Sequence, residues 1–175
     1  MCQFGADLLS PGVGGLEART VEGMARPLRE QLPGGVYHVG ARGVDRCSIY
    51  RDLDDRRLFL CLIELAAQRT DVIVRAYCLM TTHYHLVVET PELSLSKALQ
   101  LVNGRYAQLF NDRHQRVGHL FQGRFWADLI ESDEQFENVC RYVVNNPVRA
   151  GLVKRWREWP WARYSPEGSC VRGPW

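Results

Sequence analysis

A predicted β-hairpin at residues 71–90, DVIVRAYCLMTTHYHLVVET, is the strongest constraint on the fold. Two apolar runs rich in β-branched residues lie on either side of Thr81 and Thr82, a pattern typical of two strands joined by a short turn. His83 and His85 lie in the second run, where apolar side chains would pack better. These two histidines therefore need an explanation other than packing.

The segments around this hairpin predict an α+β fold. Residue alternation and helical spacing of apolar residues favour strands at 36–41 and 126–130 and helices at 51–70, 93–114 and 132–146. A capping box from Ser132 to Gln135 opens the last helix, and Pro147 stops it. The order β-α-β-β-α-β-α indicates a ferredoxin-like antiparallel sheet with helices packed on one face.

The length and composition predict one soluble domain. The 175 residues are 46% hydrophobic and 24% charged, which is typical of a globular protein. Residues 1–30 are expected to form a poorly structured N-terminal extension, residues 31–165 the compact domain, and residues 166–175 a C-terminal tail.

Several features favour a cytoplasmic protein that is not inserted in a membrane. The sequence has no apolar run of the roughly 18 residues that a membrane span needs, and its start does not resemble a signal peptide. The six cysteines have irregular spacing without a CxxC pair, so we expect them to be reduced.

The basic residues gather in two segments of the chain. Residues 97–126 contain five Lys and Arg against one acidic residue, and residues 141–163 contain six against one. Of the 22 Lys and Arg, all but Lys97 and Lys154 are Arg, which pairs well with phosphates. The pattern fits either a solvated basic face or a phosphate-binding surface.

The histidine pair has the spacing of a metal site. Residues two apart on a strand share a face, with Cα atoms about 6.6–7 Å apart, so His83 and His85 can converge on one ion. Tyr84 is expected to face the core instead. Such pairs also occur without a metal, and Glu89 fits either a further ligand or an ordinary carboxylate at a strand end.

The last predicted helix carries a second pair of candidate residues. Tyr142 and Asn146 are four positions apart and share a helical face. Each has an ordinary explanation, since a helical Tyr often packs in a core and an Asn before Pro often ends a helix. Together with the histidines and the Arg-rich surface, they fit a nuclease with a tyrosine nucleophile. Its divalent metal would polarise a phosphodiester, and its phenolate would form a 5′-phosphotyrosyl link.

The segments LMTTHYHLVVET, GHLFQGRFWADLI, CRYVVNNPVRAGLV and WPWARYS resemble the HUH single-tyrosine transposases, and most closely the REP-associated tyrosine transposases with an IS200-like domain. The resemblance extends over residues 33–165 and implies that His83 and His85 bind Mg²⁺ or Mn²⁺. It also implies that Tyr142 is the nucleophile and Asn146 the third ligand. The chain departs from the family pattern at Thr81-Thr82, where relatives have Pro-Asn or Pro-Asp, and at Tyr84, where they have an aliphatic residue or Phe.

By the same resemblance, the partner is single-stranded DNA beside imperfect palindromic hairpins (REP-like), and the protein is a monomer or weak dimer. The residues predicted to contact nucleic acid are Arg105, Arg113, Arg116, Arg124, Arg141 and Arg149. Two alternatives remain: a domesticated nucleic-acid-binding module with little or no catalysis, and a metal-dependent phosphodiesterase acting on small nucleotides without a covalent tyrosine. Hairpin binding without metal-dependent cleavage would favour the binding module.

Overall fold

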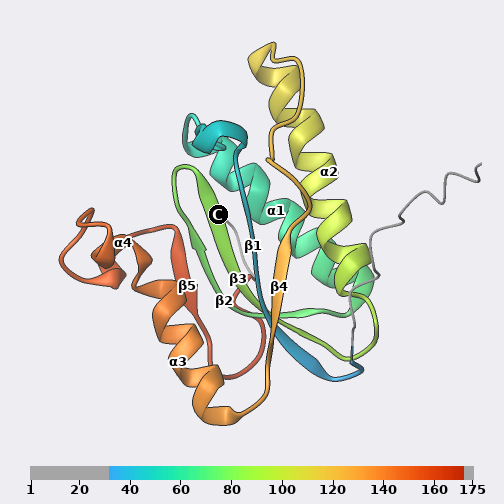
Figure 1. Ribbon diagram of the computed structural model, residues 1–175, viewed down its shortest axis with the longest axis vertical. Coiled ribbons are helices and arrows are strands. Elements are labelled where there is room, and N and C mark those ends of the chain that lie inside the picture. The colour runs from blue at the N-terminus through green and yellow to red at the C-terminus, as the bar shows by residue number, and fades with distance from the viewer. Residues whose placement is uncertain (1–31, 172–175) are drawn as a thin grey trace, which may run out of the picture.

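The computed structural model describes residues 32–171, and its centre is a five-stranded antiparallel sheet (Figure 1). The strand order across the sheet is β4-β1-β3-β2-β5. The strands are β1 (Gly35–Arg42), β2 (Ile73–Leu79), β3 (His83–Thr90), β4 (Trp126–Ile130) and β5 (Ala162–Tyr164). The α+β class and the antiparallel sheet predicted from the sequence are confirmed.

Helices cover both faces of the sheet. The helices are α1 (Leu53–Thr70), α2 (Leu95–His114), α3 (Asp133–Val144) and the single turn α4 (Asn146–Arg149). Helices α1 and α2 pack on one face, as expected, whereas α3 packs on the opposite face against β2, β3 and β5. The prediction that helices lie on one face therefore holds for α1 and α2 but not for α3. The near-continuous burial of β2 and β3 is the physical reason, because strands covered on both faces are apolar throughout.

The predicted hairpin forms between β2 and β3. A hydrogen bond within the hairpin stabilises its turn, since Met80 donates its N–H to the carbonyl of His83 at 2.9 Å. The preceding chain also holds the turn: Gly43 donates to the carbonyl of Thr82 and Ile49 to that of Thr81. The first histidine therefore starts β3 from a fixed turn.

The predicted capping box opens α3 with one change. The hydroxyl of Ser132 accepts the N–H of Gln135 at 3.2 Å, whereas the Gln135 side chain accepts the N–H of Glu131 at 2.8 Å. Helix α3 ends at Val144, and Pro147 lies in the first turn of α4. Two short 3-10 turns, Val44–Arg46 and Trp156–Glu158, complete the regular elements among the described residues.

The C-terminal segment adds a strand to the sheet. Residues 162–164 form β5 and pair with β2, with Ala76 opposite Tyr164. Beyond β5, Cys170 donates its N–H to Val74, and both Cys170 and Val171 are buried. The expected tail at 166–175 is thus packed on the domain as far as residue 171. The expected extension at 1–30 lies outside the described residues.

Two further expectations can be compared with the structure. None of the helices among residues 32–171 is both long and apolar enough to cross a membrane. The cysteines of this part of the chain are all unpaired, and Cys78, Cys140 and Cys170 are buried.

Candidate active site

The two predicted histidines lie on the sheet face that α3 partly covers. Their ring centroids are 5.1 Å apart, and His85 is buried while His83 is partly exposed. Tyr84 points to the other face, is fully buried, and donates its hydroxyl to Oδ1 of Asn103 at 2.8 Å. Strand alternation predicts this arrangement, and the bulky Tyr84 does not obstruct the histidine face. Glu89, at the far end of β3, forms an ion pair with Arg75.

A third histidine, His38 of β1, joins the pair. Its Nε2 lies 3.1 Å from Nδ1 of His85, and the two rings stack at 5.3 Å. In the β1–β3 register Gly40 lies opposite His85, so His38 is its diagonal neighbour. The sequence predicts a strand at 36–41 that includes His38 but no role for this histidine. A polar residue on an apolar strand was the available signal, but only the strand pairing brings it to His85.

All three imidazoles favour their neutral form. Burial, with smaller contributions from His38, His83 and Arg42, lowers the pKa of His85 to about 3. Burial also lowers the pKa of His38, partly opposed by the carboxylate of Asp128, and burial followed by Arg42 lowers the pKa of His83. Neutral imidazoles keep a nitrogen lone pair free to bind a metal.

Hydrogen bonds also select which nitrogens remain available. Nδ1 of His83 lies 3.0 Å from the Thr82 hydroxyl, and Nδ1 of His85 is next to His38. The Nε2 atoms of His83 and His85 are therefore the ones left for a ligand, and their Nδ1 partners hold the ring orientations. The Thr81-Thr82 turn, although it departs from the family pattern, supplies one of these partners.

Helix α3 places Tyr142 over the histidines. The Tyr142 ring centroid lies 6.0 Å from that of His85 and 5.9 Å from that of His38, and the side chain is 38% exposed. The next residue, Val143, is fully buried and anchors the helix to the sheet. The Arg149 guanidinium lies 4.8 Å from the Tyr142 ring centroid. The phenol is thus accessible and has a cation beside it.

Asn146 lies one turn after Tyr142. Its side-chain Nδ2 donates to the carbonyls of Tyr142 at 3.0 Å and Val143 at 3.2 Å, so it caps the helix. The amide nitrogen is engaged, which leaves Oδ1 as its potential metal ligand. Two imidazole nitrogens and an amide oxygen are donor types that divalent metal ions accept, so the chemistry of these side chains is compatible with a divalent metal.

Trp126 of β4 forms the other side of the site. Its ring packs edge-on against His38 at 4.6 Å and His85 at 5.6 Å. Trp126 lies opposite Gly40 in the β1–β4 register, and a Cβ on Gly40 would be 2.5 Å from its indole and 2.5 Å from the carbonyl of Tyr84. Glycine at position 40 is therefore required for the indole to lie against β1 beside the histidines.

A hollow of about 280 Å³ opens beside the histidines. Its wall contains two cations, Arg42 and Arg124, and the amide of Gln122. The lining residues are Ala41, Arg42, His83, Tyr84, His85, Gln122, Gly123, Arg124 and Trp126. The two guanidinium groups suit an anionic ligand. Arg42 was not singled out from the sequence.

The six predicted nucleic-acid contacts occupy different places. Arg124 lines the hollow and Arg149 covers Tyr142, so both lie at the candidate site. Arg141 is exposed on α3, 4.0 Å from Glu137, and Arg105 on α2 donates to Gln108. Arg113 and Arg116 lie at the C-terminal end of α2, where Arg113 pairs with aspartates and Arg116 stacks near Phe110.

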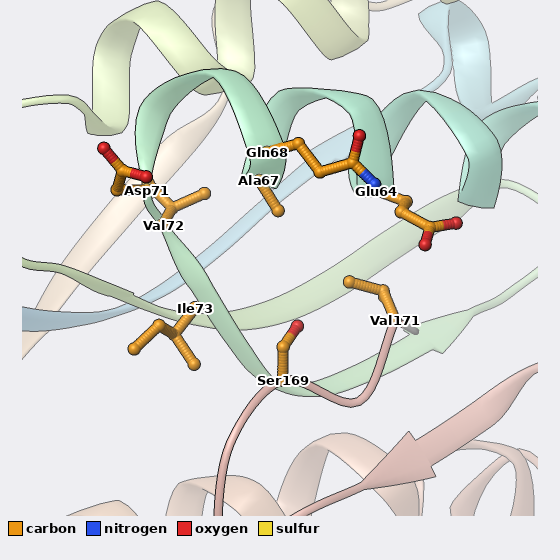
Figure 2. Close-up of a pocket in the computed structure, with 8 residues that line it drawn as sticks. All are labelled: Glu64, Ala67, Gln68, Asp71, Val72, Ile73, Ser169 and Val171. Carbon is orange, nitrogen blue, oxygen red and sulfur yellow. The ribbon is translucent and has the colours of Figure 1, made fainter. Parts of the chain in front are cut away.

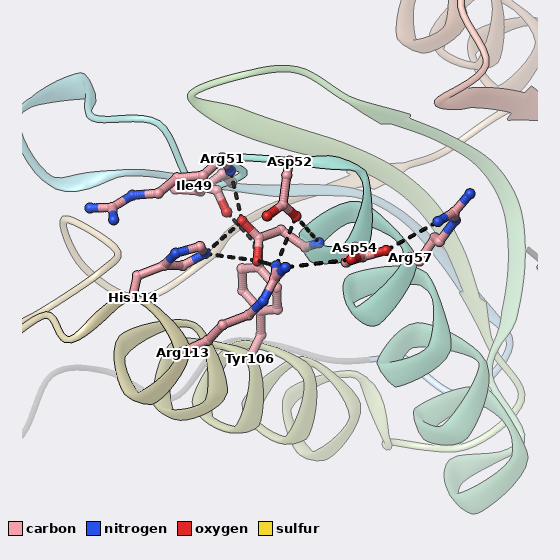
Figure 3. A network of polar contacts seen from close by, with 9 residues as sticks. Ile49, Arg51, Asp52, Asp54, Arg57, Tyr106, Arg113 and His114 are labelled. Atoms are coloured by element: carbon pink, nitrogen blue, oxygen red, sulfur yellow. Dashed lines mark hydrogen bonds and ion pairs between the residues drawn. The ribbon is translucent and has the colours of Figure 1, made fainter.

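A second polar cluster joins α1 to the end of α2 (Figure 3). Ligand atoms of Asp52, Asp55 and His114 lie within 4.8 Å of one another, close enough to share a metal. However, Arg113 already donates to Asp55 at 2.6 Å and to Asp52 at 2.8 Å. The buried Asp55 also accepts from the backbone of Arg51 and lies 2.9 Å from His114. Because a guanidinium already neutralises these carboxylates, we interpret the cluster as an ion-pair network.

Another hollow, of about 480 Å³, lies between the end of α1, the start of β2 and residues 169–171 (Figure 2). Among the residues that the structure describes, its charged lining side chains are Glu64 and Asp71, and none of the lining residues is a cation or a histidine. This hollow does not suit a phosphate, unlike the one beside His83 and His85.

Comparison with known proteins identifies the family. The sequence model described as "Transposase IS200 like" matches residues 34–146, which include the histidines and Tyr142. The chain belongs to the IS200-like transposase family. This membership confirms the resemblance noted in the sequence.

Two individual relatives are consistent with this family. A candidate REP-associated tyrosine transposase of Haemophilus influenzae is 28% identical over 100 residues, which cover 51% of this chain and 57% of that protein. The chain thus matches little more than half the length of this relative. The solved structure of a REP-associated tyrosine transposase bound to a REP hairpin superposes with a TM-score of 0.66 at 18% identity, covering 79% of this chain and 82% of that one. The structural likeness supports the IS200-like fold.

Proposed function

We propose that this IS200-like protein is a metal-dependent single-strand DNA endonuclease and transposase. It would cleave and rejoin DNA near palindromic hairpins through a 5′-phosphotyrosine on Tyr142. The observation that carries the proposal is the position of Tyr142, half exposed and packed on His85 and His38, one helical turn before Asn146. The relative that was solved with a REP hairpin supports the choice of DNA.

The proposed chemistry starts from a phosphodiester in the hollow beside the histidines. A divalent metal held by His83, His85 and Asn146 would polarise a non-bridging oxygen of that phosphate. Arg42 and Arg124 line the hollow and would hold the DNA backbone. The two guanidinium groups would offset the negative charge of the phosphate that Tyr142 attacks.

Tyr142 would attack the phosphorus directly. Its Oη–P bond forms while the P–O3′ bond breaks, the phenol loses its proton, and the departing 3′ oxygen takes one up as a hydroxyl. Arg149, whose guanidinium lies over the Tyr142 ring, would hold the phenol in place by a cation–π contact. In the reverse step a 3′-hydroxyl attacks the phosphotyrosine, so the strands are rejoined without an external energy source.

The proposal includes a monomer that acts in the cytoplasm. His83, His85 and Tyr142 of one chain lie on the same face of the sheet, and Asn146 follows one helical turn after Tyr142, which supports a single chain as the source of the proposed set. The unpaired cysteines among residues 32–171 are compatible with a reducing compartment.

The direct test is a covalent adduct. Hairpin oligonucleotides with randomised six-nucleotide single-stranded flanks are incubated with the full chain and Mn²⁺, then separated on a denaturing gel. A 3′-label should remain on the protein, whereas a 5′-label should be released on a fragment with a free 3′-hydroxyl. Tyr142→Phe should abolish the adduct and still bind the hairpin. Tyr164→Phe makes the same change on β5 and should keep the adduct.

A second candidate function is a DNA-binding module with little or no catalysis. The capping bonds of the Asn146 amide favour it, because they tie one proposed ligand to its own helix. Salt-dependent hairpin binding by the wild-type chain, with no adduct in Mn²⁺ or Mg²⁺, would establish this alternative and overturn the transposase proposal.

A further inference from the structure

A second hollow adjoins the candidate active site on the α2 side. It has a volume of about 450 Å³, within the range of small-ligand pockets. Gly123 and Arg124 line both this hollow and the one that contains the histidines, so the two hollows adjoin at this loop. A DNA strand that passes Gly123 and Arg124 would contact both hollows.

At two positions in the wall of this hollow, nothing within the chain requires the residue to be glycine. Gly104 lies inside α2, where glycine costs about 0.5–1 kcal/mol relative to alanine. A Cβ at Gly104 or Gly123 would meet no atom within 4 Å beyond the local backbone, and neither residue has a positive φ. Neither packing nor backbone conformation thus requires glycine. Close approach of a ligand to the backbone would require it.

The polar side chain in the wall is fixed in orientation. Asn103 uses its Oδ1 to accept the hydroxyl of Tyr84, the residue between the two histidines on β3. Its Nδ2 group is the part that remains to donate to a ligand, so the complementary ligand atom is an acceptor. The exposed amide of Gln100, one turn earlier on the same helix, lines the same wall.

The remaining lining consists of Ser96 and two apolar side chains, with a cation where the two hollows adjoin. Leu99 and Phe125 contribute largely buried apolar surface, and Arg124 lies where the two hollows meet. A hollow lined by apolar side chains, amide groups and a guanidinium matches the chemistry of a nucleotide: a base that stacks, an edge that forms hydrogen bonds, and a phosphate.

We propose that this second hollow, bounded by Asn103, Gly104, Gly123 and Phe125, binds one unpaired nucleobase of the DNA strand next to the scissile phosphate. The inference rests on the proposed function, because the adjoining phosphate would lie in the histidine hollow. A paired base is excluded from such a hollow, since its edge is already hydrogen-bonded and its faces are stacked. The hollow would thus select single-stranded DNA at this position.

The first test fills the hollow. Gly104→Leu should weaken binding of the flanked hairpin pool about tenfold, measured by fluorescence anisotropy, because stacking of one base is lost. Gln68→Leu introduces the same side chain at an exposed position of α1 that lines neither of these two hollows, and it should leave the affinity unchanged. A Gly104→Leu protein that folds and binds as tightly as wild type would overturn the inference.

The second test removes a nucleobase from the DNA and leaves the hollow of the protein open. Hairpins from the bound pool are remade with one abasic site at each flank position in turn. One position should weaken wild-type binding about tenfold and cause no further loss in Gly104→Leu, since both changes remove the same contact. If the abasic and Gly104→Leu losses multiply at every position, the base lies elsewhere.

A third measurement is independent of DNA cleavage. Addition of dAMP, dGMP, dCMP and TMP to ¹⁵N-labelled protein should shift the amide signals of Gly104 and Gly123 for at least one nucleotide. Shifts without any Tyr142 adduct would keep the base site and reject the transposase proposal. An adduct with neither shifts nor an effect of Gly104→Leu would keep the transposase proposal and reject the base site. If the amide shifts, the Tyr142 adduct and the effect of Gly104→Leu are all absent, both the base site and the transposase proposal are rejected.

Discussion

The Nε2 atom of His38 lies 3.1 Å from the Nδ1 atom of His85, so a residue of β1 sets the orientation of a proposed metal ligand on β3. This contact joins neighbouring strands, and the two histidines are 47 residues apart along the chain. It leaves Nε2 of His85 for the metal and ties the geometry of the proposed site to the register of the sheet. His38 is thus a positioning residue for the site as proposed.

His38→Ala should weaken Mn²⁺ binding about 10- to 100-fold, because the hydrogen-bond partner of a metal-binding imidazole has an effect of this size. Titration calorimetry with Mn²⁺, and the Mn²⁺ dependence of adduct formation, would measure the change. His38→Gln can supply a hydrogen-bonding amide and should recover part of the affinity. His119→Ala, at an exposed histidine, is the control. An unchanged Mn²⁺ affinity in His38→Ala would exclude the positioning role.

Gly40→Ala should destabilise the fold by about 1–3 kcal/mol, because the added Cβ would overlap with the Trp126 indole and the Tyr84 carbonyl. The indole should also move, which tryptophan fluorescence of the folded protein would detect. Urea unfolding gives the stability. Gly104→Ala is the matched variant: the space around it is open, so it should stabilise α2 by about 0.5–1 kcal/mol. If Gly40→Ala and Gly104→Ala changed the free energy of unfolding in the same direction, the proposed difference between the two glycines would be contradicted.

Asp55→Ala should lower the free energy of unfolding by about 2–3 kcal/mol, since Asp55 is fully buried and accepts hydrogen bonds from charged groups. Asp54→Ala, at an exposed aspartate, should change it by less than about 0.5 kcal/mol. The stabilisation by Mn²⁺ should be the same in Asp55→Ala and wild type. Loss of that stabilisation would show instead that the Asp52–Asp55–His114 cluster holds the metal.

Stability should fall at alkaline pH because of three buried thiols. Burial raises the pKa of Cys78, Cys140 and Cys170 to about 12, whereas unfolded thiols ionise near pH 8.5. The unfolded chain therefore loses protons first, so the stability is complete below about pH 8.5 and decreases as the pH rises from there toward 12. Urea midpoints between pH 7 and 10.5 would show this decrease.

The same burial predicts which thiols react. Exposed Cys61 should be alkylated rapidly by iodoacetamide at pH 8, and Cys78, Cys140 and Cys170 only on unfolding. Cys61→Ser should remove that position from the rapidly labelled sites identified by mass spectrometry. Equal labelling rates for all of these cysteines in the folded protein would contradict the burial argument.

Local patterns were sufficient for most of the fold. The apolar, β-branched run after Thr81 and Thr82 located β3. Because side chains on a strand alternate between its faces, the sequence also placed Tyr84 on the face opposite His83 and His85. The capping box at Ser132 located the start of α3 for a similar local reason, whereas α3 ends at Val144 and Pro147 lies in the first turn of α4. The short β5 was missed, since three residues carry too little periodicity to distinguish a strand from a loop.

The sequence by itself determined the hairpin, the main helices, the family resemblance and the Tyr142–Asn146 spacing, because each depends on neighbouring residues or on short motifs. Only the tertiary structure decided that α3 covers the second face of the sheet, that His38 and Trp126 flank His85, and that Arg149 lies over Tyr142. These relationships join residues from separate elements. They depend on strand register and helix packing, which no local pattern encodes.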